Sequence, residues 1–304
     1  MTPDLTDIAA NITTDPRQAI GIPLALIGAV FLSLGAQFQH QGVTKVEANT
    51  VEVTAGLNRR QLLLLLSRPS WVLGTVMLGL AIVLQLVSLN YAPLIVVQPL
   101  GAIALVITTI LNARISRVSP TRESLIAIAM CIGGIGLFVT VAAFTAIDAP
   151  IDDQKLVTIL IILAVVLSAV AISFFFLRNQ FKAIYYIVCA GVLYGFVATL
   201  AKVIIERVQN ANFEWLTLTC LVGLLLAAAL GAYFVQNAYS SGPPDLVIAG
   251  LTVIDPLVAV AIGILVLGEA SQAPLWAAIT FVVAGAVAIW GVFLLAKYHP
   301  QSKG

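Results

Sequence analysis

The chain has 304 residues, of which 61% are hydrophobic and only 10% are charged. Soluble globular domains carry roughly 45–50% apolar and about 25% charged residues, so this composition excludes a protein that hides its apolar side chains in a water-soluble core. The formal net charge of +1 gives no indication of a nucleic-acid partner or of a strongly acidic partner.

Apolar stretches long enough to cross a bilayer recur along the whole chain. A spanning helix needs about 20 apolar residues, and it must bond its backbone groups internally because lipid offers no partners. β-Barrel strands are shorter and alternate in polarity. The predicted fold class is therefore all-α, a polytopic transmembrane helical bundle. Nine stretches are expected to span: 20–42, 71–89, 93–111, 124–146, 155–177, 183–205, 215–237, 244–268 and 273–297.

The segments outside the spans are short. Residues 1–19 form an acidic tail, which is not typical of a secretory signal because such a signal begins with basic residues. Between the first two spans, residues 61–66 are apolar but too short to span, and arginines flank them. An interfacial helix is therefore expected within 56–68. Residues 298–304 form the C-terminal tail.

Lysine and arginine are divided unevenly between the two ends of the predicted spans. Short loops rich in these residues stay in the cytoplasm. One side carries Lys45, Arg59, Arg60, Arg68, Arg114, Arg117, Arg122, Arg178, Lys182, Lys297 and Lys303. The other side carries only Arg17, Lys155 and Arg207. We therefore expect the N-terminus outside and the C-terminus in the cytoplasm, with the protein in the cell (plasma) membrane.

The third and eighth predicted spans share a pattern. Each contains a polar residue, a proline and a leucine in sequence: Gln98-Pro99-Leu100 in one and Asp255-Pro256-Leu257 in the other. Each pattern is followed by a short polar loop with a further proline, and then by a span rich in glycine and alanine. Pro99 and Pro256 are therefore predicted helix breaks at equivalent places.

This pattern divides the chain into a first repeat (20–146), a connector helix (147–182) and a second repeat (183–297). Because four helices and the connector separate equivalent spans, the second repeat is expected to be upside down relative to the first. An inverted 4+1+4 repeat of this kind is a recurring build of secondary transporters, whose binding sites lie near the bilayer midplane at broken helices.

Several segments resemble known membrane proteins. The run 90–102, Asn-Tyr-Ala-Pro-Leu-Ile-Val-Val-Gln-Pro-Leu-Gly-Ala, is similar to the third-helix signature of the NIPA-type proteins. The run 31–42 is similar to that family's opening helix, although histidine and glutamine replace the family's paired lysines. Residues 191–202 and the Leu-Gly-Glu at 267–269 resemble the broader drug/metabolite transporter (DMT) superfamily of the EamA-like type.

The resemblance covers nearly the whole chain from about residue 20. It implies an inverted-repeat helical fold and a role in transport. NIPA proteins are associated with magnesium transport, whereas members of the superfamily carry metabolites, drugs and lipid-linked sugars. The resemblance therefore leaves the substrate open.

Asp255 is the strongest candidate for a binding residue, because it is an acid near the middle of a predicted span. An ionisable side chain costs about 2.5–3.5 kcal/mol at that depth on insertion scales, and such residues usually serve function. Beside Pro256, which removes a backbone donor, the carboxylate can bind a metal cation, hold a proton or pair with an amine. The alternative is that Asp255 hydrogen-bonds to a neighbouring helix and only sets packing.

Lys202 lies in the sixth predicted span, one helical turn before Glu206. The two side chains can form an ion pair in which Lys202 extends toward the interface. The alternative is a direct contact between Lys202 and the substrate.

Uncharged amides add further candidates, namely Gln85, Gln98, Gln236 and Asn237, all within predicted spans. Amides in membrane helices commonly bond helix to helix for about 0.6 kcal/mol each, and this packing role is the expected one for most of them. Gln98 is the exception, because it mirrors Asp255. We expect Gln98 to line a central site as a donor and acceptor.

The predicted function is a secondary transporter of the drug/metabolite transporter type, which moves a small organic solute or lipid-linked headgroup by alternating access. The alternatives are a NIPA-like magnesium transporter, in which Asp255 and Asp245 face a hydrated ion, and a non-transporting membrane scaffold. An enzyme is not expected, because the sequence offers no nucleophile with a base and no phosphate-binding loop. No cofactor is implied. The expected partners are the solute or ion and membrane lipids, and the oligomeric state stays open.

Overall fold

The computed structural model describes residues 17–47, 67–115, 121–177, 183–241 and 244–297. The predicted interfacial helix falls almost entirely outside these ranges, as do the two terminal tails. The helices are α2 (Gln18–Glu47), α4 (Pro69–Tyr91), α5 (Leu94–Gly101), α6 (Ile103–Ile115), α7 (Arg122–Thr145), α8 (Asp153–Leu177), α9 (Ala183–Gln209), α10 (Trp215–Ser241), α11 (Pro244–Ile262) with a π-helical turn (Gly263–Leu267), and α12 (Leu275–Lys297).

Within these ranges, nine segments are long and apolar enough to cross a bilayer, and each coincides with one predicted span. The third span is made of α5 and α6 together. Large apolar side chains point outward, among them Phe175, Leu265 and Val282, with 79%, 82% and 73% of their surface exposed. Soluble monomers rarely expose a contiguous apolar surface of this extent. The prediction of an all-helical, multispanning membrane protein is therefore confirmed for the described residues.

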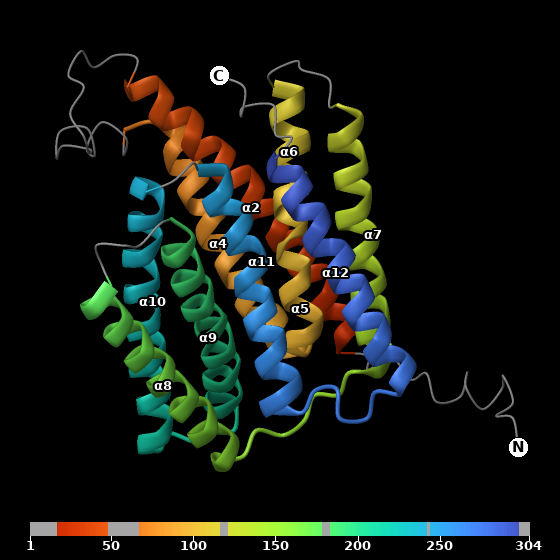
Figure 1. Cartoon of the computed structure of the whole chain (residues 1–304), viewed down its shortest axis with the longest axis vertical. Helices are drawn as coiled ribbons and strands as arrows, with labels where there is room; N and C mark the ends of the chain where they lie inside the picture. The colour runs from red at the N-terminus through yellow and green to blue at the C-terminus, as the bar shows by residue number, and fades with distance from the viewer. Residues whose placement is uncertain (1–16, 48–66, 116–120, 178–182, 242–243, 298–304) are drawn as a thin grey trace, which may run out of the picture.

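Successive spans run in alternate directions (Figure 1). Helices α5 and α11 lie near the middle of the bundle, with α8, α9 and α10 on one side and α7 and α12 on the other. Four connections lie at the bottom of the view in Figure 1, namely α4–α5, α7–α8, α9–α10 and α11–α12. This end of the bundle is called the lower end below. This is the end predicted to face outward.

Close backbone contacts hold neighbouring helices together. A Cβ atom placed on Gly74 of α4 would lie 2.6 Å from the backbone nitrogen of Gln39 and 2.7 Å from the carbonyl oxygen of Gly35, both on α2. On α9, a Cβ atom at Gly195 would lie 2.7 Å from the side chain of Val258 on α11. These distances leave no room for a side chain, so α2 lies directly on α4 and α9 directly on α11.

We expect Gly74→Ala to destabilise the protein by about 1–3 kcal/mol, because the added methyl group must push α2 away from α4. Gly79→Ala on the same helix is the matched control, because none of the described residues lies within 4 Å of its Cβ position. Alanine also favours a helix over glycine by about 1 kcal/mol. Measured by thermal unfolding in detergent, the midpoint temperature should fall for Gly74→Ala and not for Gly79→Ala. Equal midpoints for the two variants would contradict the packing of α2 on α4.

The two mid-span prolines affect their helices differently. The third span is interrupted at Ala102, whose N–H donates to the carbonyl oxygen of Pro99 over 3.2 Å. In contrast, α11 continues through Pro256, so the break predicted there is not found. A proline removes one backbone donor, and neighbouring helices in a membrane bundle can accommodate this loss without ending the helix. The irregular backbone of this span lies later, in the turn Gly263–Leu267 and at Gly268, whose φ is +78°.

Candidate functional site

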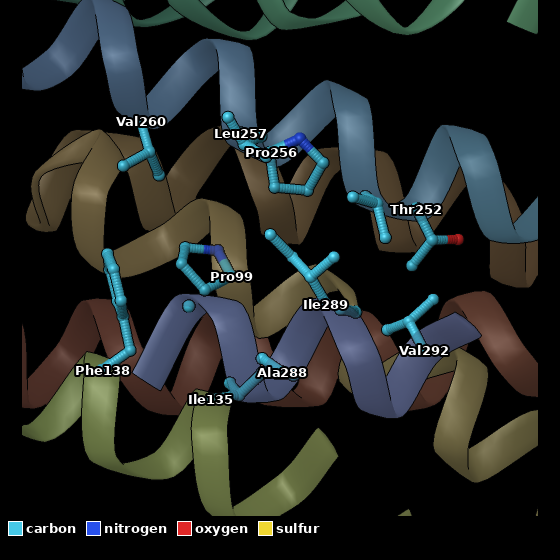
Figure 2. Close-up of a pocket in the computed structure, with 13 residues that line it drawn as sticks. Pro99, Ile135, Phe138, Thr252, Pro256, Leu257, Val260, Ala288, Ile289 and Val292 are labelled. Atoms are coloured by element: carbon cyan, nitrogen blue, oxygen red, sulfur yellow. The ribbon is translucent and has the colours of Figure 1, made fainter. Parts of the chain in front are cut away.

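A partly open cavity of about 110 Å³ lies where α5, α7, α11 and α12 meet. Pro99 of α5 and Pro256 of α11 both line it, and Figure 2 shows their rings on neighbouring helices, facing each other. The lining residues are Pro99, Ala102, Ile135, Phe138, Thr252, Val253, Pro256, Leu257, Val260, Gly285, Ala288, Ile289 and Val292. The two prolines that the sequence pattern pairs therefore border a single space, called the proline cavity below.

The wall of the proline cavity is apolar. Thr252 carries the only polar side chain among the described residues that line it, and its hydroxyl donates to the carbonyl oxygen of Ile248 over 2.7 Å. Such a surface accepts the apolar part of an organic molecule. It presents no carboxylate, which is the kind of ligand that Mg²⁺ prefers.

Gln98 and Asp255 are not among the residues that line the proline cavity, although each precedes one of its prolines. Gln98 is buried in α5. The backbone of Asp255 packs on α9, where its carbonyl oxygen lies 3.0 Å from the position of a Cβ atom on Gly195. That Gln98 and Asp255 line one common site stays a prediction.

The carboxylate of Asp255 is incompletely paired. Its Oδ1 atom is buried and has no hydrogen-bond partner in the described part of the chain. An unsatisfied buried acceptor costs roughly 1–3 kcal/mol, and such groups are few in native proteins. A hydrogen bond to a neighbouring helix, the packing alternative raised above, does not account for this atom. Asp255 therefore remains the strongest candidate for holding a proton or a cation.

Lys202 lies in an ionic cluster near the lower end of α9, in which Lys202 and Glu269 are buried and Asp148 is partly exposed. Its Nζ atom lies 2.7 Å from Oδ1 of Asp148 and 3.3 Å from Oε1 of Glu269, and it donates to the carbonyl oxygen of Ala92 over 3.3 Å. The predicted pairing with Glu206 is not found among the described contacts. The Glu206 carboxylate instead accepts the Ile151 N–H over 3.1 Å. Lys202 therefore pairs with acids of two interhelical connections, Asp148 and Glu269, and not with Glu206 on its own helix.

Glu269 is the least exposed member of this cluster, with 1% of its surface accessible. Its two carboxylate oxygens accept the backbone N–H groups of Leu94 and Ile95, each over 2.8 Å. These donors belong to the first turn of α5, where backbone N–H groups lack partners within the helix and the helix dipole favours a negative charge. This position of the Glu269 carboxylate requires a glycine at 263, because a Cβ atom there would lie 2.8 Å from Oε2 of Glu269.

A polar cavity of about 260 Å³ opens beside this cluster at the lower end. It is called the lower vestibule below. Its lining residues are Arg17, Leu89, Asn90, Asp148, Ala149, Pro150, Lys202, Ile205, Glu206, Gln209 and Asn210. Lys202 and Asp148 are thus shared between the ionic cluster and the vestibule, whereas the buried carboxylate of Glu269 is not a lining residue.

A second ionic group ties three helices together at the same end. Arg207 of α9 pairs with Asp153 at the start of α8 and with Glu214 just before α10, the latter over 3.3 Å. Its Nε also donates to the hydroxyl of Thr217 over 3.1 Å. Because Arg207 is 5% exposed and its partners come from the starts of α8 and α10, these contacts link α8, α9 and α10.

The remaining predicted residues are dispersed. Gln85 is partly buried on α4, and Gln236 is exposed on α10. The side-chain amide of Asn237 donates to the carbonyl oxygen of Tyr233 on its own helix over 2.8 Å. The side chain of Asp245 lies outside the described set. No group of three or more His, Cys, Asp and Glu side chains that could hold a metal occurs in the part of the chain that the structure describes.

Sequence reasoning did not identify Glu269 and Asp148 as partners of Lys202. In the sequence, Glu269 belongs to the Leu-Gly-Glu motif, and Asp148 is one of several acids between predicted spans. One signal was present, since a lysine within a span requires a counter-charge. The sequence alone does not show which of several acids at the same end supplies it.

Comparison with known proteins gives a full-length similarity but no function. The chain is 24% identical to an uncharacterized protein of Corynebacterium glutamicum over 286 residues, which cover 94% of this chain and 97% of the relative. The similarity is therefore not confined to one group of spans. No protein-family model matches the chain, and no solved structure matches it.

Proposed function

We propose that this protein is a secondary transporter that moves a small organic solute or a lipid-linked headgroup across the membrane by alternating access. The observation that carries the proposal is the proline cavity, in which Pro99 and Pro256 face each other inside the membrane. Transporters built from inverted repeats bind their substrates near the midplane, at irregular helices contributed by both halves.

The helix arrangement supports two inverted halves. If α2, α4, α5–α6 and α7 correspond to α9, α10, α11 and α12, equivalent helices run in opposite directions. The pairs α2–α4 and α9–α10 are then equivalent, and both are among the most extensively packed pairs. Helices α5 and α11 contact each other, as do α7 and α12, so equivalent helices meet around the proline cavity.

The chemistry of the cavity favours an organic solute over an ion. The apolar wall suits a hydrocarbon or aromatic portion of a molecule, whereas a hydrated magnesium ion requires oxygen ligands. Asp255 offers one carboxylate outside the cavity lining, where it can hold the coupling proton or cation, or an amine of the solute. A non-transporting scaffold gives no reason for two paired prolines at one intramembrane space.

Filling the proline cavity tests this proposal. The Cβ position of Gly285 has no closer neighbour than Phe138 at 3.9 Å, so a leucine there extends into the cavity. We expect Gly285→Leu to abolish transport, while Val282→Leu, which faces lipid on the same helix, leaves it unchanged. The measurement is metabolite and lipid profiling of a deletion strain complemented with each variant.

Two outcomes of these experiments contradict the proposal. Full complementation by Gly285→Leu, at wild-type protein levels, would show that the proline cavity is not on the transport route. Magnesium flux into proteoliposomes that contain the purified protein and no organic solute would favour the ion-transporting alternative instead.

A further inference from the structure

Glu269 joins four separate parts of the fold at the lower end. Its side chain, in the α11–α12 connection, caps the first turn of α5 and contacts Lys202 of α9. Its backbone carbonyl oxygen accepts the N–H of Ile147 in the α7–α8 connection over 2.8 Å. One residue therefore links elements of both proposed halves and of the segment between them.

This cluster separates a polar space from an apolar one. On one side lies the lower vestibule, which Lys202 and Asp148 line. On the other side, Leu94 and Ile95 are completely buried. Pro99 follows five residues after Leu94, a rise of about 7.5 Å along an α-helix, and it lines the proline cavity. Helix α5 thus runs from the ionic cluster to the cavity.

Helix α5 is a short unit with an irregular backbone at both ends. It has eight residues, begins after the non-helical pair Ala92-Pro93 and ends at the interruption at Ala102. The segment that carries Glu269 is irregular as well, since a π-helical turn and the left-handed Gly268 precede it. Irregular turns of this kind within helices are frequent at functional sites.

A permanent structural cap does not require ionic groups here. A buried ion pair gives little net stability compared with apolar residues of the same shape, because desolvation offsets the attraction between the charges. Charged partners do permit a contact that is closed when the charges are paired in a dry environment and open when water solvates each charge separately. The adjoining vestibule provides such water access.

We propose that Glu269 is the gate residue of the lower end: its contacts with α5 and Lys202 hold this end closed, and their separation opens a route from the vestibule to the proline cavity. This inference rests on the proposed transport function, and it assigns the conformation described here as closed at the lower end. Glu269 is a positioning residue, since it acts by holding α5.

Cysteine accessibility tests the gate without a known substrate. The background is the full chain in nanodiscs with Cys131, Cys189 and Cys220, all buried, replaced by alanine. A single Leu94→Cys substitution then places a thiol on the buried side of the ionic cluster. The measured quantity is the rate at which a membrane-impermeant maleimide labels this thiol. We expect Glu269→Gln to raise the labelling rate at least about tenfold, which corresponds to about 1.4 kcal/mol. Glutamine keeps the shape but loses the charge that Lys202 and the helix dipole hold.

Two controls accompany the measurement. Glu206→Gln, which changes a vestibule acid outside the Lys202 contacts, should leave labelling of Leu94→Cys unchanged. Asn210→Cys, which is exposed at the vestibule, should react in every background. If Glu269→Gln does not yield folded protein, Glu269→Asp, whose shorter side chain keeps the charge but reaches α5 less well, should raise labelling less strongly.

Labelling of Leu94→Cys that stays equally slow with glutamate, glutamine or aspartate at position 269 would overturn the gate and leave Glu269 as a structural cap. The readout does not depend on transport. Faster labelling together with full complementation by Gly285→Leu would therefore support the gate and reject the proline cavity as the transport route.

Discussion

Replacing Lys202 with methionine is expected to destabilise the protein by about 3–5 kcal/mol, because Glu269 then remains as a buried charge without its cation. The side chains of Lys202 and Glu269 are 4% and 1% exposed, so the carboxylate that remains is shielded from water in the closed conformation. Proteins are stable by only about 5–15 kcal/mol in total. Thermal unfolding in detergent should therefore show a large fall in the midpoint, or little folded protein.

Two further variants identify the cause of this loss. Lys155→Met removes a lysine at the same end that donates to the carbonyl oxygens of Pro150 and Leu267 and is in no described ion pair, so it should cost less. The double variant Lys202→Met with Glu269→Gln should be more stable than Lys202→Met alone, since it also removes the uncompensated charge. A double variant that is less stable than Lys202→Met would contradict the ionic cluster.

Asp255→Asn is expected to leave the protein folded and to abolish transport. The substitution keeps the size of the side chain but removes its charge and its ability to exchange a proton. Because Oδ1 of Asp255 has no described partner, the substitution breaks no hydrogen bond between helices at that atom. The midpoint of thermal unfolding should stay equal to that of the wild type or rise, while complementation of a deletion strain is lost.

Gln236→Leu is the control for this prediction, because Gln236 is a polar residue on an exposed face of α10 and should tolerate the change in both measurements. Normal complementation by Asp255→Asn at wild-type protein levels would remove Asp255 from the mechanism. A marked fall in thermal stability would instead support the packing role that the sequence left open.

The spans could be predicted because their signal is local. Each apolar run contains its own evidence, and the structure places a helix on every one of them. The pairing of Pro99 with Pro256 was likewise visible as a repeated pattern, and both residues line one cavity. The predicted break at Pro256 is wrong, because the effect of this proline on α11 depends on how the neighbouring helices accommodate the missing donor.

The ionic cluster was less accessible to sequence reasoning. Lys202 was expected to pair with Glu206 because helical neighbours are the only geometry that a sequence alone supplies. Its actual partners, Asp148 and Glu269, lie in two different connections that the tertiary fold brings together. The cap on α5 is equally hard to predict from sequence, because Leu94 and Glu269 are far apart along the chain and meet only in the assembled bundle.

Alternating access requires that the proline cavity be reached from both sides of the membrane, and the accessibility of position 252 to thiol reagents measures this directly. Thr252 lines the cavity, and cysteine is close to it in size. In sealed vesicles, an impermeant thiol reagent should modify Thr252→Cys, in the cysteine-free background, from either side, and modification should block transport. A cysteine that no impermeant reagent reaches from one or both sides would contradict alternating access through this cavity.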